Sequence, residues 1–180
     1  TALRRTIAVL FSILALSWFG LSLGNAEFCS GRWANQRGWH KVAKRLFYQA
    51  AGKDDYRAFF ELGVMYEKGH GGPEYMKMAG ACFLMAANHG DPCAHEVLAH
   101  KYETGSGAER NLMRAYIRYL VASDIFRKEG LGALAPTKDA ARVGRQLTSH
   151  QLRVAEKSAK DLMRTIGPSP YSLRSGGAVS

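Results

Sequence analysis

The stretch AFFELGVMYEKGHGGPEYMKMAGACFLMAANHGD, from Ala58 to Asp91, decides the fold because its skeleton returns 36 residues later. The second copy, AHEVLAHKYETGSGAERNLMRAYIRYLVAS, runs from Ala94 to Ser123. The two copies share alanine, leucine, aromatic and glycine positions, whereas the residues between these positions differ. Similarity at one fixed period is typical of solenoid proteins, in which each unit stacks on the next.

The shared positions suit two antiparallel helices joined by a glycine turn. In the first helix they lie at i, i+4 and i+8 on one stripe, and the glycines that follow can adopt the left-handed backbone of a helix stop. Small and aromatic residues of the second helix would fill the space between units. The predicted structural positions are Ala58, Leu62, Tyr66, Gly69, Gly71, Ala79, Phe83, Ala86, Leu98, Tyr102, Gly105, Gly107, Ala115, Tyr119 and Ala122.

The pattern A-x-x-x-L-G-x-x-Y-x-x-G-x-G, followed by A-x-x-x-F/Y-x-x-A-A and G-D, resembles the Sel1-like repeat over residues 38–124. Ala99 departs from this pattern because it stands where the first copy has glycine, which suggests a terminal unit. The resemblance implies an all-α, TPR-like α/α superhelix that works as an adaptor rather than as a catalyst. Residues 141–163 resemble the capping segment of exported Sel1-like proteins, with Thr148 as helix N-cap and Gln151 three residues later.

The sequence predicts six parts. They are an N-terminal hydrophobic helix that is a membrane anchor or signal segment (1–26), a linker and half repeat (27–54), a first repeat (55–90), a second repeat (91–124), a loop with C-terminal capping helices (125–166) and a tail (167–180). The loop is expected over residues 127–139.

The N-terminal segment predicts export. Arg4 and Arg5 precede an uncharged stretch from Ile7 to Leu23, and this order of charges places the following residues outside the inner membrane, in a periplasm. The stretch is at the short end for a membrane span, whereas GNA at 24–26 resembles a signal-peptidase site. An uncleaved anchor flanked by Trp18 and Trp33 and a cleaved signal with a secreted or periplasmic product both stay open; we favour the anchor.

The predicted partners are other protein subunits of a membrane complex, with lipid bound through the N-terminal helix. The net charge of +10 is compatible with anionic lipid or acidic protein, and export argues against nucleic acid. A helical wheel places one face of the first helix of each unit opposite its packing stripe, as a groove or as a mixed solvent face. The predicted partner-binding residues on this face are Phe60, Val64, Glu67, Glu96, His100 and Glu103.

No catalytic residue, metal ligand or cofactor is predicted, since the sequence lacks H-x-x-x-H, C-x-x-C and H-E-x-x-H. The histidines, His95 among them, are expected at the surface or in the groove. Cys82 and Cys93 are expected to lie too far apart for a disulfide. The predicted function is a non-catalytic scaffold subunit of a membrane or cell-envelope complex, such as a respiratory or dehydrogenase assembly. The alternatives are a free periplasmic chaperone or regulator and, less favoured, a cell-wall or β-lactam hydrolase.

Overall fold

The computed structural model describes residues 23–130 and 134–167, and within these ranges the chain forms eight α-helices and no β-strand. The all-α prediction is therefore confirmed for this part of the chain. The helices are α2 (Leu23–Gln36), α3 (His40–Ala51), α4 (Arg57–Glu67), α5 (Met76–Asn88), α6 (Pro92–Thr104), α7 (Leu112–Lys128), α8 (Leu134–Gly144) and α9 (Ser149–Thr165).

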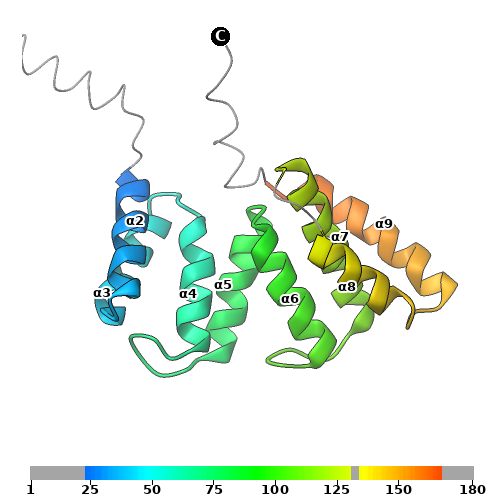
Figure 1. The fold of residues 1–180 in the computed structure, drawn as a ribbon, viewed down its shortest axis with the longest axis horizontal. Helices are drawn as coiled ribbons and strands as arrows, with labels where there is room; N and C mark the ends of the chain where they lie inside the picture. The colour runs from blue at the N-terminus through cyan, green and yellow to red at the C-terminus, as the bar shows by residue number, and fades with distance from the viewer. Residues whose placement is uncertain (1–22, 131–133, 168–180) are drawn as a thin grey trace, which may run out of the picture.

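From α2 to α8, helices that follow one another in the sequence also pack against one another in space (Figure 1). α2 packs on α3, α3 on α4, and the series continues through α5 and α6 to α7. At the C-terminal end, α7 contacts both α8 and α9. This serial packing is that of an α/α solenoid, in which each unit contacts its neighbours.

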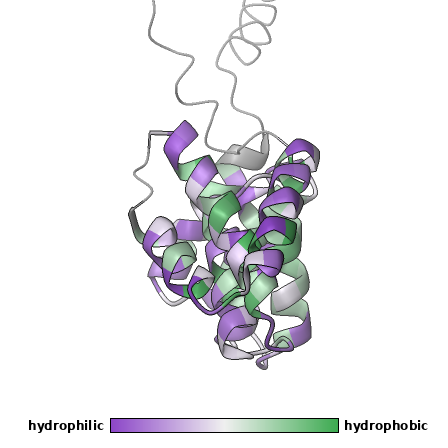
Figure 2. Ribbon diagram, turned by 90° about the vertical axis from the view of Figure 1, so that its right-hand side faces the viewer, coloured by the Kyte–Doolittle hydropathy of each residue, from purple (hydrophilic) through white to green (hydrophobic). Residues whose placement is uncertain are grey.

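The repeat skeleton forms the contacts between units. Its alanines are buried together with Leu62, Phe83, Leu98 and Tyr119, whereas Tyr66 and Tyr102 pack half-buried against the same clusters. Each helix buries one stripe and leaves the rest to solvent, so hydrophobic and hydrophilic residues occur along the same helices in Figure 2.

The glycine turns have the predicted backbone. Gly69, Gly71, Gly105 and Gly107 have φ angles of +65°, +79°, +79° and +77°, in the left-handed region. Space also limits the residue type at Gly71, because a Cβ there would lie 2.9 Å from the carbonyl oxygen of His40. The turn after α4 therefore packs directly on the start of α3.

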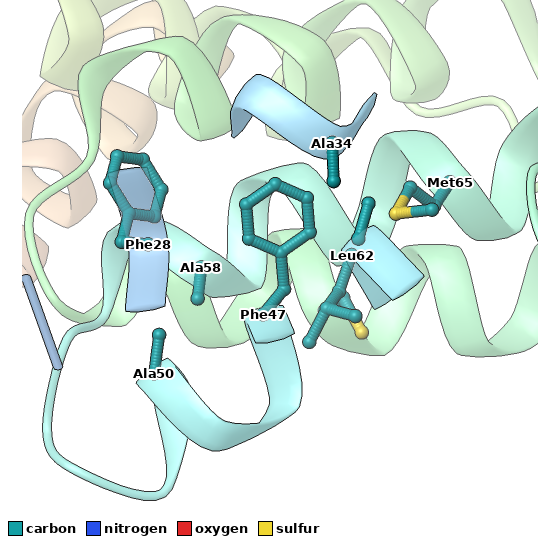
Figure 3. Close-up of a cluster of buried hydrophobic side chains, with 9 residues drawn as sticks. Phe28, Ala34, Phe47, Ala50, Ala58, Leu62 and Met65 are labelled. Carbon is teal, nitrogen blue, oxygen red and sulfur yellow. The ribbon is translucent and has the colours of Figure 1, made fainter. Parts of the chain in front are cut away.

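The first helical pair is complete, which differs from the predicted linker and half repeat. Residues 27–36 lie in α2, and α2 packs on α3. Figure 3 shows Phe28 and Ala34 of α2 directed toward Phe47 of α3 and Leu62 of α4. The other predicted domain boundaries stay a prediction.

α2 does not appear in the 36-residue repeat because the spacing between its glycine and the phenylalanine that faces it is four residues shorter than in the next pair. Gly31 faces the ring of Phe47 in the first pair, as Gly63 faces Phe83 in the second. Gly31 precedes Phe47 by 16 residues, whereas Gly63 precedes Phe83 by 20. The connection between α2 and α3 is shorter than that between α4 and α5, so α2 falls out of the 36-residue register.

The loop predicted for residues 127–139 is shorter than expected, because α7 extends to Lys128 and α8 begins at Leu134. Arg127 and Lys128 each pair with Asp124 one turn earlier, at 2.5 and 2.6 Å. Cations in the last turn also interact favourably with the helix dipole. Both effects favour continuing α7 over starting a loop.

The predicted start of the last helix is confirmed. The Thr148 hydroxyl accepts a hydrogen bond from the Gln151 backbone N–H at 3.3 Å, and the Gln151 side-chain oxygen accepts one from the Thr148 N–H at 2.9 Å. This reciprocal pair is a capping box, and it satisfies two backbone donors that the helix itself leaves unpaired.

Most of the predicted anchor lies outside the described residues, and with it Arg4, Arg5 and Trp18. Residues 23–26, the end of that segment, begin α2. Of the helices within 23–130 and 134–167, none combines the length and the apolar character that crossing a membrane requires. The predicted tail likewise lies outside the described residues, apart from Gly167.

Candidate functional site

A pocket of about 450 Å³ opens between α4, α6, α7 and α8, in the second half of the solenoid. Three of the six predicted partner-binding residues line it, namely Glu67 of α4 and Glu96 and His100 of α6. The remaining lining residues are Val97, Lys101, Ser106, Tyr119 and Asp139. Three carboxylates therefore share this pocket with one lysine, although the chain as a whole is basic. We call it the acidic pocket.

Lys101 is the buried cation of the acidic pocket. Its Nζ lies 2.5 Å from a Glu67 carboxylate oxygen, and 5.8 Å from the centroid of the Phe83 ring. The lysine side chain is 8% exposed and that of Glu67 is 32% exposed. This ion pair joins α6 to α4 across the unit boundary. Because one partner is buried, the cost of desolvating it offsets much of the attraction between the two charges.

Glu96 and Asp139 bring two negative charges to the same pocket from α6 and α8. Burial raises the pKa of the Glu96 carboxyl, and the neighbouring Asp139 carboxylate raises it further. Arg142 pairs with Asp139 at 2.9 Å. Among the basic side chains of the described ranges, none forms an ion pair with Glu96, so this carboxylate is available to a cation from outside.

Glu103, the sixth predicted residue, lies beside the acidic pocket and is already engaged. Its carboxylate accepts hydrogen bonds from the Tyr119 hydroxyl at 3.0 Å and from Arg142 at 2.9 Å. The Arg142 guanidinium holds the pKa of the Glu103 carboxyl below its usual value. Glu103 therefore ties α6 to α7 and α8 and shapes the pocket wall.

Phe60 and Val64 do not line the acidic pocket. Both are half-buried against the cluster of Ala79, Phe83 and Leu98, and the Phe60 ring lies 5.6 Å from that of Phe83. The predicted face is therefore divided, because Phe60 and Val64 take part in apolar packing whereas the three residues named above line the pocket.

Solved structures with the same arrangement of helices identify the fold. A protective antigen present in uropathogenic Escherichia coli strains, which displays a Sel1-like repeat (SLR) fold, superposes with a TM-score of 0.70 at 25% identity over 87% of this chain. The chain folds as a Sel1-like repeat protein. It covers about a third (33%) of the length of that antigen.

A second Sel1 repeat protein, from Oxalobacter formigenes, superposes with a TM-score of 0.53 at 20% identity, over 91% of this chain and 79% of its own. At sequence level, no protein-family model and no curated protein matches the chain. The Sel1-like arrangement of the helices is thus found by comparing structures and not by comparing sequences. Solenoids of this kind present extended concave surfaces for binding.

His95 is neither at the surface nor in the groove of this Sel1-like solenoid, contrary to the prediction. It is fully buried, its Nε2 donates to the Ala87 carbonyl oxygen at 3.0 Å, and its Nδ1 accepts from Arg118 at 3.2 Å. Burial and the Arg118 charge lower its pKa to about 3. His95 occupies the repeat position of Phe59, a signal in the sequence that this site is internal.

Sequence reasoning also missed Lys101, Tyr119 and Asp139 as pocket residues. Lys101 occupies the position that Met65 holds one unit earlier. This correspondence could have indicated that its stem is buried, as it is in the structure. Tyr119 was predicted as a structural residue, and its hydroxyl reaches the pocket rim. Asp139 comes from α8, outside the repeat, so no period could have placed it there.

Neither a cluster of potential metal ligands nor a disulfide between Cys82 and Cys93 occurs in the part of the chain that the structure describes. No group of three or more His, Cys, Asp or Glu side chains within 23–130 and 134–167 is placed to hold a metal ion. Cys82 is buried and Cys93 half-buried, and no disulfide joins them. Burial raises the pKa of both thiols, to about 11 at Cys93, so both are protonated at neutral pH and poorly nucleophilic.

Proposed function

We propose that this Sel1-like protein is a non-catalytic scaffold subunit that holds a basic side chain of another polypeptide in the acidic pocket. The observation that carries the proposal is the convergence of Glu96 and Asp139 from different helices on one opening. A lysine or arginine of a partner would face both carboxylates there. Tyr119 and Val97 would contact the apolar stem of that side chain.

The proposal also places the protein at a membrane. The uncharged segment from Ile7 to Leu23 behind Arg4 and Arg5 supports an uncleaved anchor, with the helical solenoid on the periplasmic side. The partners would then be other subunits of a membrane or cell-envelope complex, for which a respiratory or dehydrogenase assembly is one candidate. N-terminal sequencing of the native protein tests this part: a start near Glu27 would replace the anchored subunit with a free periplasmic protein.

Site-specific photo-crosslinking tests the docking site. A photoreactive residue at His100, which is exposed at the pocket, is expected to capture a discrete polypeptide in intact cells. The same probe at Met85 of α5, 43% exposed and outside the pocket, is the matched control. The capture is expected to disappear when Glu96→Gln and Asp139→Asn are combined, because both remove charge with little change in shape.

Two outcomes would contradict the docking proposal. One is capture of the same polypeptide from Met85 and His100 alike, which would indicate random collision. The other is a monodisperse, lone monomer after purification in mild detergent, since a subunit of a stable complex should carry its partners with it.

A further inference from the structure

A second cavity, of about 470 Å³, lies on the first helical pair, away from the acidic pocket. Its lining is almost wholly apolar and includes Cys29, Trp33, Trp39, Val42 and Leu46. Trp33 is 49% exposed, Trp39 51% and Val42 39%. We call this surface the Trp patch. Large apolar side chains that gather in one exposed place mark an interaction surface, whereas single ones do not.

The rings of the Trp patch are held in place by their neighbours. Trp33 and Trp39 pack edge to face, with centroids 5.2 Å apart and an interplanar angle of 86°. The Arg37 guanidinium lies 4.5 Å from the centroid of the Trp33 ring. Half of each indole is nevertheless open to solvent, so the packing orients the rings without covering them.

Basic residues are frequent in the two helices that carry the Trp patch. Between residues 23 and 51 the sequence has five basic side chains and one acidic side chain, Glu27. Four of the basic side chains are exposed, namely Arg32, Arg37, Lys41 and Arg45. Arg32 is paired with Glu61 of α4 at 3.8 Å, and the Arg37 guanidinium lies over Trp33. Arg45 follows Val42 by three residues, about 60° around the helix, so it borders the patch. Tryptophan with arginine and lysine around it is the composition of protein surfaces that lie at a membrane interface.

The sequence before α2 fits the same surface. Residues 6–26 contain no charged side chain, and α2 begins at Leu23, ten residues before Trp33. If α2 stood upright on the membrane, Trp33 would be about 15 Å from Leu23 along the helix axis. This exceeds the roughly 5–8 Å depth of one interfacial layer. Contact of Trp33 with lipid therefore requires α2 to lie along the membrane surface. In that orientation Trp39, which packs on Trp33, and Arg45 of the next helix would also be close to the lipid.

We propose that the Trp patch rests on an anionic lipid surface, with its indoles at the level of the headgroups and its basic rim on lipid phosphates. The membrane placement rests on the proposed function, whereas the contact itself depends on α2 and α3 alone. Partner docking in the acidic pocket would then take place on a body whose orientation to the membrane is fixed.

Fluorescence quenching by brominated lipid tests the contact. The full chain carrying Trp18→Phe, reconstituted in phosphatidylglycerol-containing vesicles, emits from Trp33 and Trp39 alone, because the sequence has three tryptophans. Brominated acyl chains are expected to reduce this emission, and aqueous iodide to have little effect on it. Replacing phosphatidylglycerol by a zwitterionic lipid is expected to weaken the quenching by bromine.

The matched control moves the reporter to the other end of the solenoid. In a chain with all three tryptophans changed to phenylalanine, Val154→Trp places the fluorophore on α9, far from α2 in Figure 1, where Val154 is 39% exposed. Its emission is expected to respond to iodide and not to brominated lipid. Equal responses of the two reporters would overturn the inference.

Shielding of Trp33 and Trp39 from iodide without quenching by bromine would also overturn it, because a second copy would then cover the Trp patch. Loss of the chain from the vesicle fraction is a separate result, which would refute the anchoring part of the proposed function. A vesicle-bound chain whose patch is not quenched would refute the lipid contact alone.

Discussion

Helices α4 and α6 occupy equivalent places in successive units, yet they use the same positions in opposite ways. Three substitutions at the 36-residue spacing exchange apolar for polar residues, namely Phe59/His95, Phe60/Glu96 and Val64/His100, and a fourth, Met65/Lys101, does the same in the core. In α4 these positions pack against neighbouring helices, and in α6 they build the acidic pocket or its support. A solenoid can therefore keep its packing skeleton while one unit acquires a binding surface.

The largest expected effect comes from exchanging the small residues of the two helices. Gly63 in α4 corresponds to Ala99 in α6. A Cβ at Gly63 would lie 2.7 Å from the ring of buried Phe83, so Gly63→Ala is expected to lower the free energy of unfolding by about 3 kcal/mol through overpacking. The reverse change, Ala99→Gly, should cost about 1 kcal/mol, chiefly in backbone entropy. Urea unfolding followed by circular dichroism measures both.

Gly80 of α5 provides the control for this exchange. It is also a helical glycine, but a Cβ there would meet no atom within 4 Å. Gly80→Ala is expected to raise stability by roughly 0.5–1 kcal/mol. If Gly63→Ala and Gly80→Ala behaved alike, the close approach of α4 to Phe83 would not be real.

The second expected effect is on the pH dependence of stability, to which His95 contributes and its counterpart Phe59 does not. The folded-state pKa of His95 is about 3, below the value near 6.5 of an unfolded chain. The unfolded state therefore binds an extra proton below pH 6.5, and stability falls as the pH falls from there toward 3. Between pH 7 and pH 5 this one residue should cost about 2 kcal/mol.

The variant His95→Gln isolates that contribution, because its side-chain amide can still donate to the Ala87 carbonyl but does not titrate. Its stability is expected to change less between pH 7 and pH 5 than that of the unaltered protein. The carboxyl groups whose pKa burial raises, Glu61 and Glu96, are common to both chains and cancel in the comparison. Parallel pH profiles for the two proteins would show that folding does not lower the pKa of His95.

The sequence could predict those helices that recur at the 36-residue spacing. The fixed spacing located α4 to α7 and their glycine turns because those two units have connections of similar length. It lost α2, where the spacing from the glycine to the phenylalanine is four residues shorter, although Gly31 and Phe47 make the same contact as Gly63 and Phe83.

Some residues of the acidic pocket could be predicted from the sequence and others could not, for a related reason. The helical wheel finds Glu67, Glu96 and His100 because they lie on one face of two equivalent helices. It cannot find Asp139, which reaches the pocket through the docking of α8 on α7, a contact that no local pattern encodes. The helical wheel also included Phe60 and Val64, which do not line the pocket. It could not exclude them, because whether a face stays open depends on which helices pack over it.

The smallest expected effect on stability comes from giving α6 the residue of α4 at the core position, Lys101→Met. A buried ion pair contributes little net stability relative to an apolar residue of similar volume. Glu67 is 32% exposed and can remain hydrated without its partner. The free energy of unfolding should therefore change by less than about 1 kcal/mol. The pocket, however, loses its cation.

Binding of a fluorescent tetralysine peptide to the Lys101→Met variant measures what this lost charge does. Affinity is expected to rise several-fold, since Glu67 joins Glu96 and Asp139 in attracting the probe, and to fall again when Glu96→Gln is added. Lys157→Met, on exposed α9, changes the net charge by the same amount without touching the pocket. An equal rise in both lysine variants would mean that the probe senses the overall charge of the protein, and the contrast between α4 and α6 would then be one of packing alone.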